Sequence, residues 1–221
     1  MTPRELLGTA EVPGGDPLRL FRRGADFMIV LDRNELMNSR MSGSEEALAT
    51  MTIERLHTPA PHLLIGGYGM GFTLRAALTK LGPAARVTVA ELVPEIIAWA
   101  REPMAALTAG CLDDARVALR YGDVADAIAD GAGQYDAILL DVDNGPDGLV
   151  RAANDRIYAA RGLATARAAL RPGGVLAVWS AGKDPAFTRR LRDAGFAVDE
   201  VSVRARSNGK GAMHTIWFGR R

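Results

Sequence analysis

The feature that most constrains the fold is an alternation, beyond Pro61, of short apolar runs with longer segments of helical periodicity. This pattern is typical of a parallel sheet with helices on both faces. We therefore predict an α/β protein with a doubly wound, mostly parallel, seven-stranded Rossmann-like sheet. Its strands are predicted at residues 62–65, 86–90, 116–120, 135–140, 175–180, 196–203 and 213–218. The last two read as a closing hairpin, which suits a sheet whose last strand runs antiparallel.

Helices are predicted between these strands, at residues 72–81, 94–107, 124–129, 163–170 and 185–194. Before them, residues 18–32 read as a small β-hairpin. Ser42 and Ser44 are cap candidates for a helix that runs to about Leu56, and Glu45 and Glu46 suit its first turn, where the helix dipole favours acids. We expect residues 1–60 to form this hairpin and helix and residues 61–221 to form the α/β domain, as one compact unit.

Charge and composition point to a small-molecule partner. The 221 residues include 27 Lys plus Arg and 26 Asp plus Glu, so no net field favours nucleic acid or an anionic membrane. No apolar stretch approaches a membrane span and the first residues lack the pattern of a signal peptide, which predicts a cytoplasmic location. Cys111 is the single cysteine, so an intrachain disulfide and a cysteine-based metal site are excluded. We expect no metal cofactor.

A glycine-rich loop follows the first predicted parallel strand. Gly66, Gly67, Gly69 and Gly71 lie between that strand and the next helix, where backbone can approach a nucleotide at a helix N-terminus. The dinucleotide fingerprint needs a third glycine where Phe72 stands, so the spacing favours a nucleoside sulfonium over NAD. The alternative is a glycine-rich turn without a ligand.

Acidic residues follow the next two strands. Glu91 stands twenty residues after Gly71, where a carboxylate in such folds accepts hydrogen bonds from the ribose hydroxyls. Leu92 follows it and is a candidate for the same nucleoside site. Asp123 and Val124 occupy the corresponding place after the third strand, which suits an adenine amino group. Asp123 is equally suited to cap the helix that starts at Val124.

The best catalytic candidate is at the end of the fourth strand. Asp141, Asp143 and Asn144 gather at the carboxyl edge, where open α/β sheets bind ligands. A carboxylate there can accept the proton of a nucleophilic amine and stabilise a nearby cation, which is the role predicted for Asp141. Asp143 and Asn144 are predicted to bind the substrate. The alternative is that these residues only build a turn before Gly145.

Several other conspicuous residues receive structural interpretations. Trp99, Trp179 and Trp217 fall within helix or strand patterns, so core packing explains them. His214 on a predicted strand is interpreted as structural. The basic loop at residues 204–210 is interpreted as solvated.

Taken together, the motifs resemble the spermidine and spermine synthase family of aminopropyltransferases, which share the fold of class I S-adenosylmethionine-dependent methyltransferases. The resemblance extends from about Leu18 to about Phe218. It is carried by the segments at residues 44–49, 65–67, 73–75, 91–95, 122–123, 135–141 and 170–174.

This resemblance implies a transferase that uses S-adenosylmethionine or its decarboxylated form as co-substrate. By resemblance, Glu91 holds the ribose, Asp123 and Val124 hold the adenine, and Asp141 activates a small amine acceptor. A homodimer is also implied. The family's glycine loop carries an acid that holds the aminopropyl amine, whereas this loop has Tyr68 and Met70. That difference keeps methyl transfer to a small molecule as an alternative.

Two other classes of function stay open. One is a non-catalytic nucleoside-binding protein that kept the fold and lost the chemistry. The other is a nicotinamide-dependent oxidoreductase, which the glycine spacing disfavours.

Overall fold

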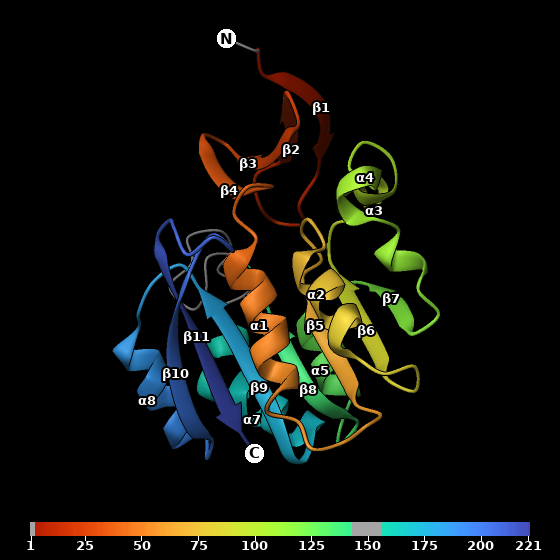
Figure 1. The fold of residues 1–221 in the computed structure, drawn as a ribbon. Coiled ribbons are helices and arrows are strands. Elements are labelled where there is room, and N and C mark those ends of the chain that lie inside the picture. Colours follow the sequence, from red (N-terminus) through yellow and green to blue (C-terminus); the bar gives the residue numbers. More distant parts are fainter. Residues whose placement is uncertain (1–2, 143–155) are drawn as a thin grey trace.

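The computed structural model describes residues 3–142 and 156–221, which form two sheets and the helices around them (Figure 1). The larger sheet has seven strands in the order β10-β11-β9-β8-β5-β6-β7. Its strands are β5 (His62–Gly66), β6 (Arg86–Glu91), β7 (Val117–Tyr121), β8 (Tyr135–Leu140), β9 (Leu170–Ser180), β10 (Ala197–Arg204) and β11 (Met213–Arg220). β5 to β9 pair in parallel, and β11 is antiparallel to both of its neighbours. The predicted fold class and the antiparallel closing strand are therefore confirmed.

Helices cover both faces of this sheet because successive strand residues point to opposite sides. Leu63 and Ile65 of β5 belong to one apolar cluster, and Leu64 between them belongs to the other. α1 (Gly43–Ile53), α2 (Phe72–Lys80) and α3 (Pro94–Arg101) pack in the first cluster. α5 (Val124–Asp130), α7 (Ala160–Ala169) and α8 (Pro185–Asp193) pack in the second. The sheet is thus buried on both faces, as its nearly continuous apolar strands require.

The smaller sheet is antiparallel and extends the hairpin predicted for residues 18–32. Its strands, in order, are β1 (Glu5–Ala10), β2 (Leu18–Arg23), β3 (Asp26–Leu31) and β4 (Asn34–Asn38). The prediction of a single hairpin was therefore incomplete. β1 and β4 escaped it because Gly8 and the polar ends of β4 weaken the apolar alternation that marks a strand. Figure 1 shows this sheet above α1 and the ends of the parallel strands.

Three predicted helices differ from the observed ones, and the first of them, expected to run to about Leu56, ends at Ile53. The helix predicted over residues 94–107 is wrong, because α3 ends at Arg101 and a short α4 (Ala105–Thr108) follows, then the 3-10 turn η1 (Cys111–Asp113). Pro103 explains the break, since it donates no backbone hydrogen bond and keeps the preceding residue out of the helical region. The helix predicted at 163–170 begins three residues earlier, and β9 takes over at Leu170.

The predicted cap of α1 is also wrong in its chemistry. Ser42 occupies the N-cap position but its side chain makes no capping bond, and its backbone is helical. Ser44 lies inside the helix and donates instead to the Glu45 carboxylate. Among the described residues, no helix is long and apolar enough to cross a membrane.

Candidate active site

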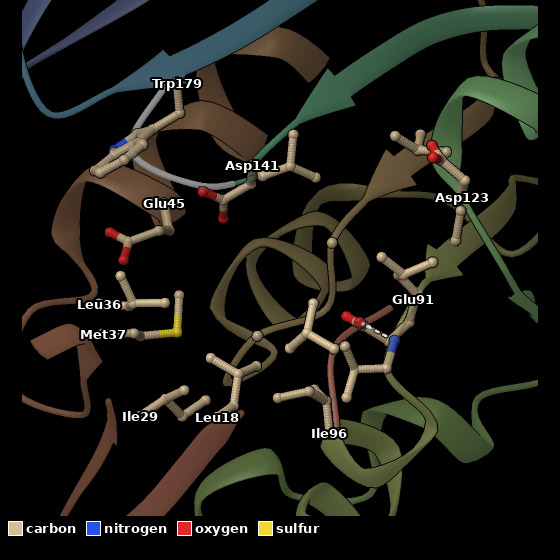
Figure 2. Close-up of a pocket in the computed structure, with 18 of the residues that line it drawn as sticks. Leu18, Ile29, Leu36, Met37, Glu45, Glu91, Ile96, Asp123, Asp141 and Trp179 are labelled. Atoms are coloured by element: carbon tan, nitrogen blue, oxygen red, sulfur yellow. Dashed lines mark hydrogen bonds between the residues drawn. The ribbon is translucent and has the colours of Figure 1, made fainter. Parts of the chain in front are cut away.

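The candidate site is a cavity between the small sheet and the carboxyl ends of the parallel strands (Figure 2). Ligands of open α/β sheets bind at this edge. The small sheet and the loop between its first two strands supply apolar walls, and α1 and the strand ends of the large sheet supply the acids. Figure 2 shows Glu45, Asp141 and Trp179 at one end of the cavity and Glu91 and Asp123 on the other side.

The glycine loop takes the backbone shape that its sequence requires. Gly67, Gly69 and Gly71 have φ values of 84°, 54° and 77°, a left-handed region that favours glycine. Gly67 and Gly69 line the cavity, and a Cβ on Gly67 would stand 2.6 Å from the carbonyl oxygen of Asp141. Gly66 instead packs against Val124, and Gly71 packs against the Tyr68 ring. Two of the four predicted binding glycines therefore face the cavity, and two serve close packing beneath it.

Glu91 ends β6 and lies in the cavity wall beside Leu92. Its carboxylate accepts hydrogen bonds from the backbone N–H of Tyr68 at 2.8 Å and of Val93 at 2.9 Å. Burial raises the pKa of Glu91, while these hydrogen bonds oppose the rise. The first of them ties the end of β6 to the glycine loop, so the carboxylate is held at the position that the sequence predicted.

Asp123 lines the cavity and also caps α5. Its side chain accepts the backbone N–H of Ala125 at 2.8 Å, which is a standard cap contact. Its other oxygen pairs with Arg156 at 2.7 Å. The capping interpretation is therefore confirmed, and Val124 lines the cavity next to it. The contact of both residues with adenine stays a prediction.

Asp141 follows β8 directly and faces the cavity. The Thr73 hydroxyl, at the start of α2, donates to its carboxylate at 2.9 Å. Burial raises the pKa of Asp141 to about 6, and the Thr73 hydrogen bond opposes the rise. A carboxylate with this pKa is a better proton acceptor than an ordinary one and is still ionised at neutral pH. Asp143 and Asn144, the predicted substrate-binding residues, lie outside the described residues.

Glu45 is a site residue that sequence reasoning missed. It was interpreted as a first-turn acid of α1, yet its side chain is buried and lines the cavity. Ser44 donates to its carboxylate at 2.6 Å, and the Ser44 hydroxyl is 2.9 Å from Nδ1 of His214. Burial, together with the negative charge of Asp141, raises the pKa of Glu45 to about 8. The only available signal was that Glu45 lies in the segment at residues 44–49, which carries part of the family resemblance but also suits the start of a helix.

Trp179 shows that its core-packing interpretation was only partly right. The residue is buried, and its ring packs edge to face against the His214 ring, with 4.8 Å between the ring centroids. It also lines the cavity. Its indole N–H has no hydrogen-bond partner among the described residues. The structural interpretation of Trp99 and Trp217 holds, since both are buried, and Trp217 donates to Thr188 at 2.8 Å.

The small sheet contributes the apolar wall of the cavity. Leu18, Ile29, Leu36 and Met37 line it from strands β2, β3 and β4. The ionisable side chains of the described lining are all acidic. They are Glu45, Glu91, Asp123 and Asp141, and no Lys, Arg or His is among the described lining residues. Within the described residues, no three His, Cys, Asp or Glu side chains gather closely enough to hold a metal ion.

Comparison with known sequences indicates one protein family. Residues 41–193 match the spermine/spermidine synthase domain. The chain is 30% identical over 164 residues to polyamine aminopropyltransferase 1 of Streptomyces coelicolor, covering 70% of this chain and 30% of that protein. It is 29% identical over 191 residues to the polyamine aminopropyltransferase of Mycobacterium tuberculosis, covering 82% of this chain and 35% of that protein. The chain thus spans only about a third of the length of these curated relatives.

Solved structures share the fold. Spermidine synthase from Thermotoga maritima superposes with a TM-score of 0.76 and 18% identity, covering 98% of this chain and 72% of that one. A spermidine synthase in complex with the transition-state analogue AdoDATO gives a TM-score of 0.75 at the same identity and coverage. Because the matched domain covers more than half of the residues, this chain belongs to the spermine/spermidine synthase family.

Proposed function

We propose that the protein transfers an aminopropyl group from decarboxylated S-adenosylmethionine to a small amine. The observation that carries this proposal is the acidic character of the cavity, whose described lining has four carboxyl groups and no basic side chain. Asp141 is ionised at neutral pH, and Glu45 can ionise beside a bound cation, whereas Asp123 is already paired with Arg156. Both reactants are cations, so they suit such a site. Intact S-adenosylmethionine carries a carboxylate that would meet no basic side chain among the described residues of the lining. Family membership supports the same conclusion.

The nucleoside half of the donor suits one side of the cavity. Glu91 would accept the ribose hydroxyls, and Gly67 and Gly69 would let the backbone approach the sulfonium closely. Leu92 would contact the ribose, while Asp123 and Val124 would border the adenine. These roles are supported by the fact that all of these residues line the same cavity. Two backbone hydrogen bonds hold Glu91 in place there.

The reaction requires a deprotonated amine, because an ammonium ion has no lone pair for attack. The amine nitrogen forms a bond to the methylene carbon beside the sulfonium, the carbon–sulfur bond breaks, and methylthioadenosine leaves. Asp141 would accept the proton that the nitrogen loses. Its raised pKa suits this step, and the acids around it favour the cationic reactants.

Methyl transfer is the second candidate, and the glycine loop favours it. Tyr68 and Met70 stand where the family has an acid for the aminopropyl amine, and both are buried. The Tyr68 hydroxyl contacts the sulfur of Cys111 at 3.3 Å, so it is engaged inside the protein. This loop therefore offers the donor amine no carboxylate, and the donor must find one elsewhere.

The experiment that separates the two candidates is a donor comparison. Purified protein is titrated calorimetrically with S-adenosylmethionine, its decarboxylated form and methylthioadenosine, and then incubated with each donor and a panel of small amines. Release of methylthioadenosine from the decarboxylated donor supports the proposal. S-adenosylhomocysteine from the intact donor supports methyl transfer. Binding without any product supports a non-catalytic nucleoside-binding protein, and binding of none of the three refutes the nucleoside site.

A further inference from the structure

We propose that Glu45 and Asp141 together form a binding site for the ammonium group of an amine carried on an apolar chain, with Ser44 and His214 positioning Glu45. Only the identification of this amine as the acceptor rests on the proposed function. The site itself is argued from the contacts of these four side chains.

The two carboxyl groups come from different elements and face one cavity. Glu45 is on α1 and Asp141 follows β8, and Figure 2 shows both at the same end of the cavity. Thr73 joins them, because its hydroxyl donates to Asp141 at 2.9 Å and lies 3.5 Å from the backbone carbonyl oxygen of Glu45. Two carboxylates in one partly buried site repel each other when both are ionised. A cation between them removes that repulsion.

Ser44 and His214 can hold the Glu45 carboxyl group in either protonation state. When Glu45 is ionised, His214 Nδ1–H donates to the Ser44 oxygen, and the Ser44 hydroxyl donates to Glu45. When Glu45 is protonated, its hydroxyl donates to Ser44, which donates to Nδ1 of His214, and the single proton of the neutral ring is then on Nε2. The chain reverses without moving a heavy atom. Glu45 can therefore lose a proton on binding a cation while its geometry is retained.

The groups facing Glu45 define its charge before an amine binds. They are Asp141 directly after β8, the neighbouring Glu46 of the same helix and His214 of β11. Burial and the two acids raise the pKa of Glu45 to about 8, and burial lowers the pKa of His214. Near pH 7 Glu45 is therefore protonated and His214 neutral. A bound R–NH₃⁺ favours ionised Glu45, which releases its proton to solvent, and no covalent bond is made or broken.

Apolar residues continue the wall beyond the carboxyl pair. Leu36 and Met37 of β4 lie beside Glu45 in Figure 2, and Leu18 and Ile29 lie next to them. A carbon chain attached to the ammonium group would cover these side chains and exclude water from them. The site therefore suits an alkylamine better than ammonium or methylammonium.

The test is calorimetric titration with n-hexylammonium chloride at pH 7, with and without saturating methylthioadenosine. Running it in two buffers of different ionisation enthalpy gives the number of protons released, which should be about one per amine bound. The Glu45→Gln variant should release none and bind about tenfold more weakly. Glu46→Gln removes the neighbouring charge that contributes least to the raised pKa of Glu45 and that lies outside the cavity lining, so proton release and affinity should change only slightly.

A second variant tests the positioning role. Ser44→Ala removes a hydrogen bond that lowers the pKa of Glu45, so proton release should persist to higher pH than in the wild type. A variant that merely loosened the helix would weaken binding without moving this pH dependence. Circular dichroism melting checks that each variant is folded.

The length of the alkyl chain tests the apolar wall. From methylammonium to hexylammonium, affinity should rise about fourfold per methylene that the wall buries. Wild-type binding without proton release, or equal behaviour of Glu45→Gln and Glu46→Gln, would overturn the Glu45 assignment, and a flat series would overturn the apolar-chain assignment. If methylthioadenosine fails to bind while hexylammonium releases a proton through Glu45, the proposed function fails and the ammonium site stands. If the decarboxylated donor is consumed but no such proton release occurs, the reverse holds.

Discussion

Replacing Glu45 by Gln should change how the stability of the protein depends on pH. The pKa of Glu45 rises from 4.5 to about 8 on folding, so the folded state binds more protons than the unfolded chain between these pH values. The favourable contribution is complete below pH 4.5 and is lost as pH rises through about 8. At about 1.36 kcal/mol per pKa unit, the free energy of unfolding should fall by on the order of a few kcal/mol across this window.

Glutamine keeps the shape of the side chain and an acceptor for Ser44 but cannot ionise. The variant should therefore lose most of the decline above pH 5 and should be more stable than the wild type at pH 9. Urea unfolding at pH 5, 6, 7, 8 and 9 measures the free energy of both proteins, with Glu46→Gln as the matched control. Parallel curves for the wild type and Glu45→Gln would refute the reasoning, because they would show that Glu45 ionises in the folded protein as easily as in water.

Three further substitutions test the site. Asp141→Asn should reduce methylthioadenosine release by about 100-fold or more while leaving nucleoside affinity within about threefold, as measured by product assay and calorimetry. Gly67→Ala should weaken nucleoside binding, because the added Cβ meets the carbonyl oxygen of Asp141. Gly110→Ala is the control, since Gly110 also has a positive φ but no atom lies near its added Cβ. This control should cost only about 1 kcal/mol of stability. Asp123→Ala should lower the free energy of unfolding by about 1 kcal/mol through loss of the α5 cap, and Asp123→Asn should retain the cap in the same urea experiment.

Most of the large sheet was predictable from the sequence because its signals are local. A buried parallel strand is largely apolar, and β8 shows this from Ala137 to Leu140, beyond the charged Asp136 near its start. β1 and β4 were missed because an edge strand of a small sheet needs few apolar residues. The break of the third helix was visible in Pro103 and should have been predicted.

The sequence predicted those site residues whose position follows from the order of the strands along the chain. Glu91 ends β6, Asp123 comes two residues after β7 and Asp141 directly follows β8, and such positions meet at one edge of the sheet. Glu45 and Trp179 could not be identified in this way. Glu45 reaches the cavity because α1 packs beside α2, and Trp179 reaches it from the far end of a long buried strand. Both placements depend on tertiary packing, which a pattern of residue types does not encode.

The contact between Ser44 and His214 joins residues 170 positions apart, and it has a consequence for how the protein is made. During synthesis the N-terminal part of a chain emerges and begins to fold first. Yet β11, which carries His214, inserts between β9 and β10 and emerges last of the strands described. Until then Glu45 lacks its positioning partner. We therefore expect the amine end of the cavity to mature late, after the nucleoside end, whose strands β5 and β6 are neighbours in both sequence and space.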